Sequence, residues 1–130
     1  MALSTTGDLF LGMGSIAGIS SRGQGFGQID TGGQVRYYTE DDGLIENQVN
    51  DFSFDEKGLL WIATMGGLSC FDGHSFKNYT VEDGLPTNHI NSLCQGRAGL
   101  LYIGSEGGLC TYDGRAFQPI HIDGVNSVFK

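Results

Sequence analysis

The sequence has little positive charge and no long apolar run. Its 130 residues include 7 Lys and Arg against 15 Asp and Glu, which gives a formal net charge of −8. A negative surface repels phosphate groups, so nucleic acid is not an expected partner. No stretch approaches the roughly 18 apolar residues of a membrane span, and the start "MALSTTGD" lacks the basic and apolar parts of a signal peptide. We expect no membrane insertion, while the cellular compartment stays open.

Cysteine is also scarce. Cys70, Cys94 and Cys110 cannot all pair within one chain, and none lies in a C-x-x-C arrangement, so a zinc site is not expected. Cys70 and Cys110 fall in strand-like segments, where cysteine most often acts as a small buried hydrophobe. A disulfide or a reactive thiol is the alternative.

Glycine, by contrast, is abundant at 22 positions, and the chain repeats itself. "YTEDDGLIENQVNDF" from Tyr38 recurs as "YTVEDGLPTNHINSL" from Tyr79, 41 positions later. "KGLLWIATMGGLSCFDGHSF" from Lys57 recurs at the same spacing as "AGLLYIGSEGGLCTYDGRAF" from Ala98. A more divergent copy precedes them, with "TGDLFLGM" from Thr6 and "GFGQID" from Gly25. This copy contains nine extra residues, within positions 14–24.

Each repeat is typical of four short strands separated by glycine-containing turns. In the second repeat the predicted strands are 49–54, 59–64, 67–71 and 75–79, and the apolar segment "LLWIAT" predicts a strand buried on both faces. Four strands in about 40 residues is the period of a propeller blade. We therefore predict an all-β fold of propeller blades, each with four antiparallel strands. The predicted blades are 1–40, 41–80 and 81–121, and 122–130 is predicted to be the innermost strand of a blade in a neighbouring chain.

Three blades cannot close a ring. The first repeat lacks a full innermost strand, while "VNSV" from Val125 matches "INSL" from Ile90. The end of one chain could therefore complete the first blade of the next. We expect a head-to-tail homodimer with six blades or a homotrimer with nine. The alternative is a fragment of a longer single-chain propeller.

The repeated "Y-T-x-x-D-G-L" and "G-L-L-W-I-A-T-M-G-G-L…F-D-G" segments resemble the two-component regulator propeller family, known from extracytoplasmic sensor regions of bacterial hybrid histidine kinases. The resemblance implies a sensor-type, non-catalytic module that binds a small polar or carbohydrate ligand. It also implies a periplasmic or extracellular location. The sequence departs from the family pattern where Gly96 replaces the acid found at Asp55, and where Tyr102 and Phe10 replace Trp61.

Candidate ligand contacts lie on one rim of the predicted blades. Loops from the outermost strand of one blade to the innermost strand of the next share this rim with the turns "MGG" and "SEGG" and with the insertion. The insertion could contact a ligand or be a flexible glycine-rich loop. Asn47 and Asn88 could bind sugar hydroxyls or cap turns. The candidate ligand-binding residues are Arg22, Gln24, Asn47, Gln48, Met65, Asn88, His89 and Glu106.

Other functions need residues that are largely missing. The acids of "EDDG" and "VEDG" could suggest calcium, but no D-x-D-x-D-G run with a distal Glu follows, and we assign them to turns. We expect no metal and no other cofactor. Two alternative functions remain, namely an interaction scaffold without a small-molecule site and an enzyme of the streptogramin-lyase type. The enzyme would need a catalytic histidine, for which His89 is the one plausible candidate.

Overall fold

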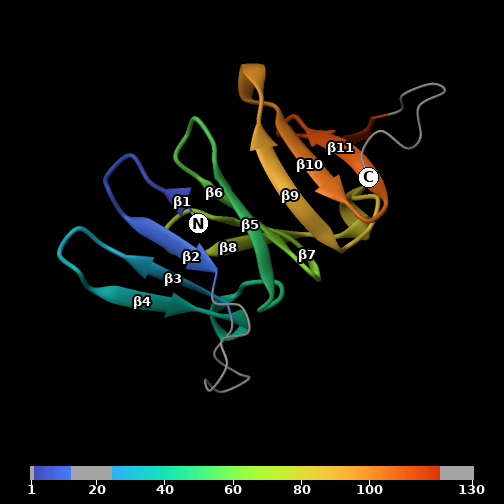
Figure 1. Ribbon diagram of the computed structural model, residues 1–130. Helices are drawn as coiled ribbons and strands as arrows, with labels where there is room; N and C mark the ends of the chain where they lie inside the picture. The colour runs from blue at the N-terminus through green and yellow to red at the C-terminus, as the bar shows by residue number, and fades with distance from the viewer. Residues whose placement is uncertain (1, 13–24, 121–130) are drawn as a thin grey trace.

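Three four-stranded antiparallel sheets make up the described part of the protein. In the computed structural model, which describes residues 2–12 and 25–120, each sheet is a meander in chain order (Figure 1). The first blade contains β1 (Ala2–Leu3), β2 (Leu9–Gly12), β3 (Phe26–Ile29) and β4 (Val35–Tyr38). The second contains β5 (Val49–Phe54), β6 (Leu60–Thr64), β7 (Gly67–Phe71) and β8 (Phe76–Tyr79). The third contains β9 (Ile90–Gln95), β10 (Leu101–Ser105), β11 (Gly108–Tyr112) and β12 (Phe117–Pro119).

The predicted all-β fold with blades of four antiparallel strands is confirmed. Two of the strands expected in the second repeat have the predicted bounds, and the other two begin one residue later. β1 has two residues where its counterparts β5 and β9 have six, so the first blade has a short innermost strand. The inserted segment and the segment around "VNSV" lie outside the described residues.

Side chains on β6 alternate between two hydrophobic cores. Leu60 and Ile62 contribute to the core shared with the first blade, whereas Trp61 and Ala63 contribute to the core shared with the third. Every residue of this strand is buried, as its apolar sequence predicts. Because side chains of a strand point to opposite faces in turn, one central strand supplies both cores. Blade-to-blade packing therefore stabilises the fold.

The connections between blades are built identically. η1 (Glu40–Asp42) and η2 (Val81–Asp83) each begin with a capping box, in which a threonine hydroxyl accepts an N–H of the turn and the aspartate accepts the threonine N–H. Each ends at a glycine with positive φ, 114° at Gly43 and 116° at Gly84. The next residues, Leu44 and Leu85, are buried in the two cores. The motif "DGL" thus ends a turn and anchors it.

Two side chains of β5 bond directly to β9. The Asn50 amide donates to the Ile90 carbonyl oxygen at 2.8 Å, and the Asp51 carboxylate accepts the backbone N–H of Leu93 at 2.8 Å. These bonds join the innermost strands of the second and third blades. A carboxylate that accepts an amide N–H makes a stronger bond than a neutral pair. Asp51 therefore fixes the spacing of adjacent blades.

The family departures at Gly96 and Tyr102 depend on one another. In the second blade, the Trp61 indole N–H donates to Asp55 at 3.0 Å, and the other Asp55 oxygen accepts two backbone N–H groups of the turn. Tyr102 has no indole N–H to satisfy. Its ring lies against Gly96 so closely that a Cβ there would collide with it. As the Tyr102 ring is placed, only glycine fits at position 96.

Replacing Asp51 with alanine should destabilise the protein by about 1–3 kcal/mol, because the amide N–H of Leu93 loses a charged acceptor. Urea unfolding followed by tryptophan fluorescence measures this change. Ser92→Ala is the matched control, since Ser92 occupies the repeat position of Asp51 and is exposed. Its effect should stay below about 0.5 kcal/mol. Equal effects of the two substitutions would contradict a special role for Asp51.

Candidate functional site

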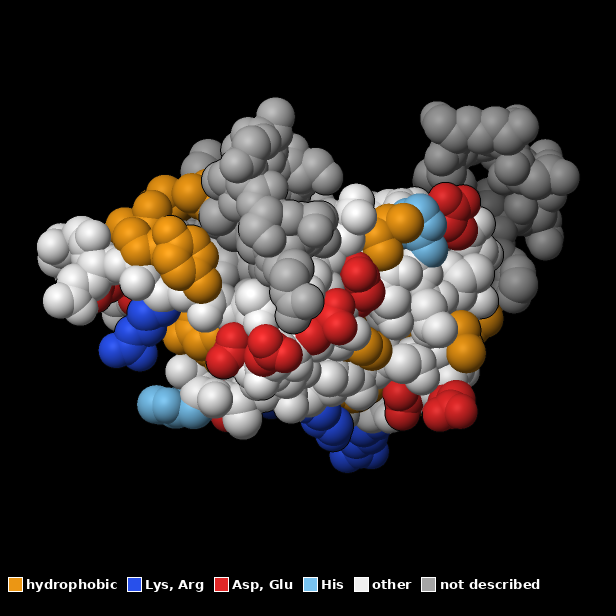
Figure 2. Space-filling model, turned by 90° about the horizontal axis from the view of Figure 1, so that it is seen from below, with side chains coloured by type: hydrophobic (Ala, Val, Ile, Leu, Met, Phe, Trp, Pro, Cys, Tyr) orange, Lys and Arg blue, Asp and Glu red, His pale blue; other side chains and the backbone are white. Residues whose placement is uncertain are grey.

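One rim of the blades brings the predicted ligand residues together. The backbone N–H of Met65 donates to the Gln48 carbonyl oxygen, and that of Glu106 donates to the His89 carbonyl oxygen, both at 3.1 Å. The turns after β6 and β10 therefore lie beside the starts of β5 and β9. Figure 2 shows the molecule from below, with acidic side chains running across this face. The strongly negative composition is thus visible on the rim where a ligand is expected.

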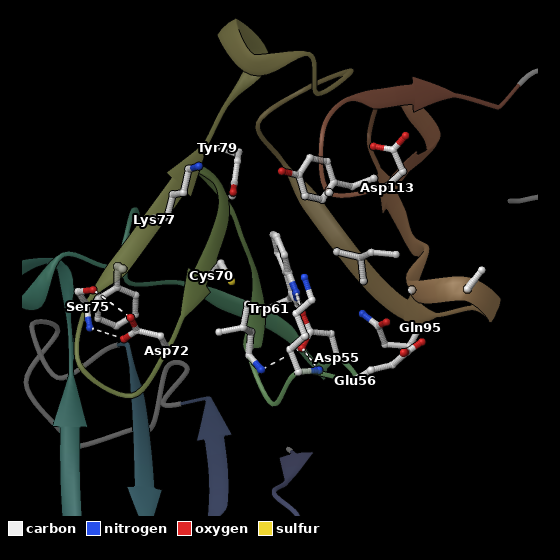
Figure 3. A pocket seen from close by; sticks show the side chains of 18 residues that line it. Asp55, Glu56, Trp61, Cys70, Asp72, Ser75, Lys77, Tyr79, Gln95 and Asp113 are labelled. Carbon is white, nitrogen blue, oxygen red and sulfur yellow. Dashed lines mark hydrogen bonds between the residues drawn. The ribbon is translucent and has the colours of Figure 1, made fainter.

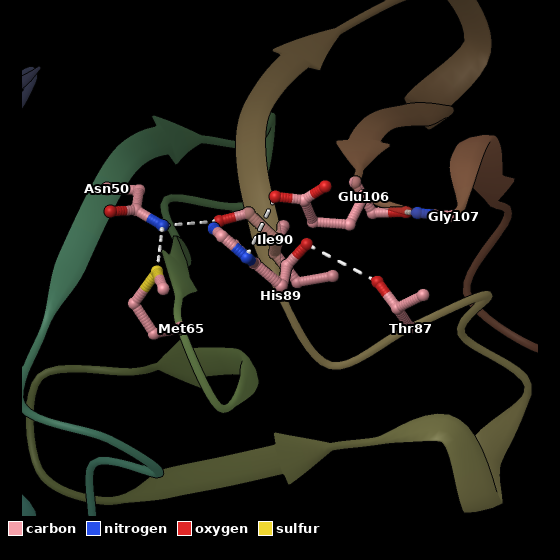
Figure 4. A network of polar contacts seen from close by, with 8 residues as sticks. Asn50, Met65, Thr87, His89, Ile90, Glu106 and Gly107 are labelled. Atoms are coloured by element: carbon pink, nitrogen blue, oxygen red, sulfur yellow. Dashed lines mark hydrogen bonds and ion pairs between the residues drawn. The ribbon is translucent and has the colours of Figure 1, made fainter.

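Four residues form the rim cluster, which we define as Asn50, Met65, His89 and Glu106 (Figure 4). The Asn50 amide nitrogen lies 3.4 Å from the Met65 sulfur, in addition to its bond to Ile90. His89 Nδ1 lies 3.2 Å from Glu106 Oε1. The cluster spans the boundary between the second and third blades. Its members come from β5, from the residue just before β9 and from the two adjacent turns.

The chemistry of the rim cluster suits binding. The Asn50 side-chain oxygen and the Glu106 carboxylate accept hydrogen bonds, and the His89 ring nitrogens donate or accept them. The side chains of His89 and Glu106 remain 32% and 60% exposed, so their polar atoms can reach a ligand. Met65 supplies an exposed apolar surface beside them. Polar groups that can hydrogen-bond to hydroxyls, beside one apolar patch, suit a small polar molecule.

Other predicted residues have partners of their own. The Asn47 side-chain oxygen accepts the N–H of Glu40 at 2.8 Å, and the Asn88 oxygen accepts the N–H of Val81 at 2.9 Å. Both amide oxygens thus hold the connection between blades, which is the turn-capping role considered for them. Gln48 is exposed at the start of β5, next to Met65. Arg22 and Gln24 lie outside the described residues.

Sequence reasoning missed Asn50. A signal was present, because "VND" and "INS" place an asparagine at the same position of both innermost strands, Asn50 and Asn91. Both side chains are exposed, and Asn50 reaches across to the third blade. In the second blade, the asparagine at the second position of the innermost strand therefore marks the contact with the third blade.

All three cysteines are free thiols, as expected for Cys70 and Cys110 as small hydrophobes. Burial, together with the nearby Asp55 and Asp72 carboxylates, raises the pKa of the Cys70 thiol to about 12. Burial raises the pKa of Cys110 to about 11. Both sulfurs therefore stay protonated at neutral pH, while Cys94 is exposed on β9.

Neither a metal cluster nor a membrane helix occurs in residues 2–12 and 25–120. No group of three His, Cys, Asp or Glu residues there could hold a metal ion. Across the same residues, no helix has the length and apolar character needed to cross a bilayer. The acids of the two turns bond to the turn backbone, since Asp42 accepts from Thr39 and Asp83 accepts from Thr80.

Comparisons with known proteins agree with the repeat structure. Residues 43–66 and 84–107 match the model of the family described as "Two component regulator propeller". A segment of 40 residues is 48% identical to histidine kinase P4 of Formosa agariphila. This segment makes up 31% of this chain and 3% of that protein. The family resemblance seen in the sequence is thereby confirmed for these two repeats.

Two solved structures share the fold. The extracellular domain of the putative hybrid two component system BT3049 from B. thetaiotaomicron superposes with a TM-score of 0.75 at 23% identity, covering 92% of this chain. The extracellular domain of BT4673 from the same organism gives 0.61 at 17% identity, covering 97%. The chain spans only 16% and 21% of these two relatives.

Cysteine accessibility predicts a simple pattern of reactivity. At pH 8, Cys94 should react with Ellman's reagent at least about 100-fold faster than Cys70 and Cys110, because thiolate and exposure both control the rate. Stopped-flow absorbance on the native protein, with the denatured protein as reference for three thiols, measures the rates. Equal reactivity of the three thiols would contradict the burial of Cys110 and the raised pKa of the Cys70 thiol.

Proposed function

We propose that this chain, which contains two repeats of the two component regulator propeller family, is a non-catalytic sensor-type propeller module. Other copies of the chain cover its open blade faces, and the resulting ring of two or three chains binds a small polar or carbohydrate ligand at the rim cluster. The two solved relatives are extracellular domains of bacterial two-component systems. We therefore also propose a periplasmic or extracellular location for this chain.

The observation that carries the proposal is the unequal burial of matched residues. Trp61 on β6 is 6% exposed, because the third blade covers it. Tyr102 occupies the same position on β10 and is 42% exposed. Tyr102 thus exposes an aromatic ring at a position that packs against the next blade, and this favours a further blade on that face.

On the opposite face of the molecule, matched residues again differ in burial. Leu60 and Ile62 of β6 are buried against the first blade. Their counterparts on β2, Leu9 and Leu11, are only half-buried. The face of Tyr102 and the face of Leu9 and Leu11 thus correspond to the two sides of one blade-to-blade contact. Head-to-tail pairing of two copies would join them, as predicted for a closed ring.

The short strand β1 supports the same arrangement. By alignment of the repeats, Ala2 and Leu3 correspond to the last two residues of β5, so the positions of 49–52 have no counterpart on β1. "VNSV" at 125–128 is the sequence that matches these four positions. Further blades of a longer chain would provide the same strand, so the assembly state distinguishes the two sources.

The ligand proposal depends on how the rim differs between blades. The repeat frame is constant, yet Gln48 and Met65 in the second blade become His89 and Glu106 in the third. These residues are at least partly exposed on the rim that carries the connections between blades. Variation of polar groups on a constant frame suits recognition, because packing does not require it.

Size-exclusion chromatography with light scattering tests the assembly. The chain should elute at two or three times 13.9 kDa, and its mass should persist on dilution. Tyr102→Glu should give mostly monomer, because a charge would be buried between blades. His74→Glu adds the same charge at an exposed turn and should leave the mass unchanged. A monomeric wild-type chain would contradict self-assembly.

A rim swap tests the ligand site. His89→Gln with Glu106→Met gives the third blade the rim residues of the second, and it should weaken binding by at least about tenfold through lost hydrogen bonds. Binding is measured by NMR titration with a panel of neutral oligosaccharides. His74→Gln is the control. Unchanged affinity, or no binding by the wild type, would favour the scaffold function instead.

A further inference from the structure

A cavity of about 570 Å³ opens between the second and third blades on the rim opposite the rim cluster (Figure 3). Trp61 and Cys70 line it from the second blade, and Leu101 and Tyr112 line it from the third. Gln95, at the end of β9, lies across from Trp61. The hairpin turns of both blades surround its mouth. The cavity therefore combines an apolar interior with a polar entrance, as ligand sites commonly do.

The repeat provides a built-in comparison. A cavity at the equivalent place between the first and second blades measures about 210 Å³. There Gln28 occupies the position of Cys70, and its amide is paired, donating to Asp8 at 2.9 Å and accepting from Tyr38 at 3.3 Å. Cysteine is much smaller than glutamine and makes no such bonds. The larger volume is thus specific to the second junction and is not required by blade packing.

Gln95 is the chemical clue in the larger cavity. Both its side-chain nitrogen and its side-chain oxygen are buried, and neither has a hydrogen-bond partner in the described part of the chain. A buried amide without partners is unfavourable, so a donor and an acceptor are needed beside it. The corresponding residue at the first junction is Phe54, which packs edge-on against Phe10 with ring centroids 5.5 Å apart. An apolar side chain is therefore compatible with this position, and the amide at Gln95 is not needed for packing.

Charge at the entrance restricts the ligand class. Four acids line the cavity against two lysines, namely Asp55, Glu56, Asp72 and Asp113 against Lys57 and Lys77. Asp55 is already bonded to the turn and to Trp61. The Lys77 ammonium lies 5.4 Å from the centre of the Tyr79 ring. The acidic excess disfavours anions.

We infer that this junction cavity is a second binding site, distinct from the rim cluster, for a small uncharged molecule that carries a carboxamide on an apolar body. The Gln95 side chain turns into the cavity, and its amide then pairs with the carboxamide, which donates one hydrogen bond and accepts another. The apolar part lies against Trp61 and Leu101, in the space that Gln28 fills at the first junction. Because it lies on the other rim, the site is independent of the proposed sensor ligand.

Benzamide is a suitable probe, and Trp61 reports its binding. Trp61 is the sole tryptophan of the chain, so its indole N–H gives a single resonance in a ¹⁵N–¹H spectrum. Benzamide should shift this resonance saturably, with a Kd of about 1 mM, as expected for so small a ligand. Benzoate has the same ring but carries a negative charge and cannot donate to Gln95. It should bind at least about fivefold more weakly.

Two substitutions separate the site from nonspecific effects. Gln95→Leu keeps the size of the side chain and should weaken benzamide binding about tenfold through loss of the amide. Cys70→Gln restores the residue of the first junction and should abolish binding by filling the cavity. Gln118→Leu, on exposed β12 and outside the cavity, should bind like the wild type.

The outcomes decide the inference. Absence of a saturable shift, or a shift that survives both substitutions, would overturn the site. Equal affinity for benzoate would overturn the ligand class. If Cys70→Gln fails to fold, the Gln95→Leu result is sufficient by itself. That variant should fold, because Phe54 at the equivalent position of the second blade is apolar.

Discussion

Packing of one blade on the next is the interaction on which the rest of the structure depends. A single four-stranded blade has two apolar faces, and β6 shows how both are covered, with alternate side chains entering two separate cores. Each large apolar side chain buried in this way contributes about 1.5–3 kcal/mol. Hydrogen bonds from Asn50 and Asp51 then fix the distance between the innermost strands. The blades at the two ends have only one such neighbour among the described residues.

A constant packing frame leaves other positions free to vary. The capping boxes and positive-φ glycines recur because they set the geometry of the connection. The rim residues and the junction between blades are different. Gln48 and Met65 give way to His89 and Glu106 without any change of strand pairing, and Gln28 gives way to Cys70 with a change in cavity volume. Repetition thus supplies a scaffold on which each junction can acquire its own chemistry.

Much of the fold could be predicted from the sequence because the signals are local and repeated. Strand bounds, turn glycines and the doubly buried "LWIAT" of β6 all follow from short-range pattern. The rim was also predictable, since chain order alone places Met65 beside Gln48 and Glu106 beside His89.

The junction cavity and the role of Asn50 were not predictable in this way. They depend on which side chains of two blades face one another across a contact, and on whether a side chain such as Gln95 finds a partner there. The link between Gly96 and Tyr102 is likewise visible only once their positions in space are known.

The central claim is that the exposed ring of Tyr102 belongs to a blade-to-blade contact. The most direct measurement is an isotope-filtered NOE experiment on a mixture of labelled and unlabelled chains. The repeat alignment places the Tyr102 ring of one copy against the Ile29 side chain of the next, as Trp61 lies against Tyr112. We expect intermolecular NOEs between the Tyr102 ring protons and the Ile29 methyl groups. Their absence in a sample at assembly concentration would contradict the proposal that a second copy covers the open face.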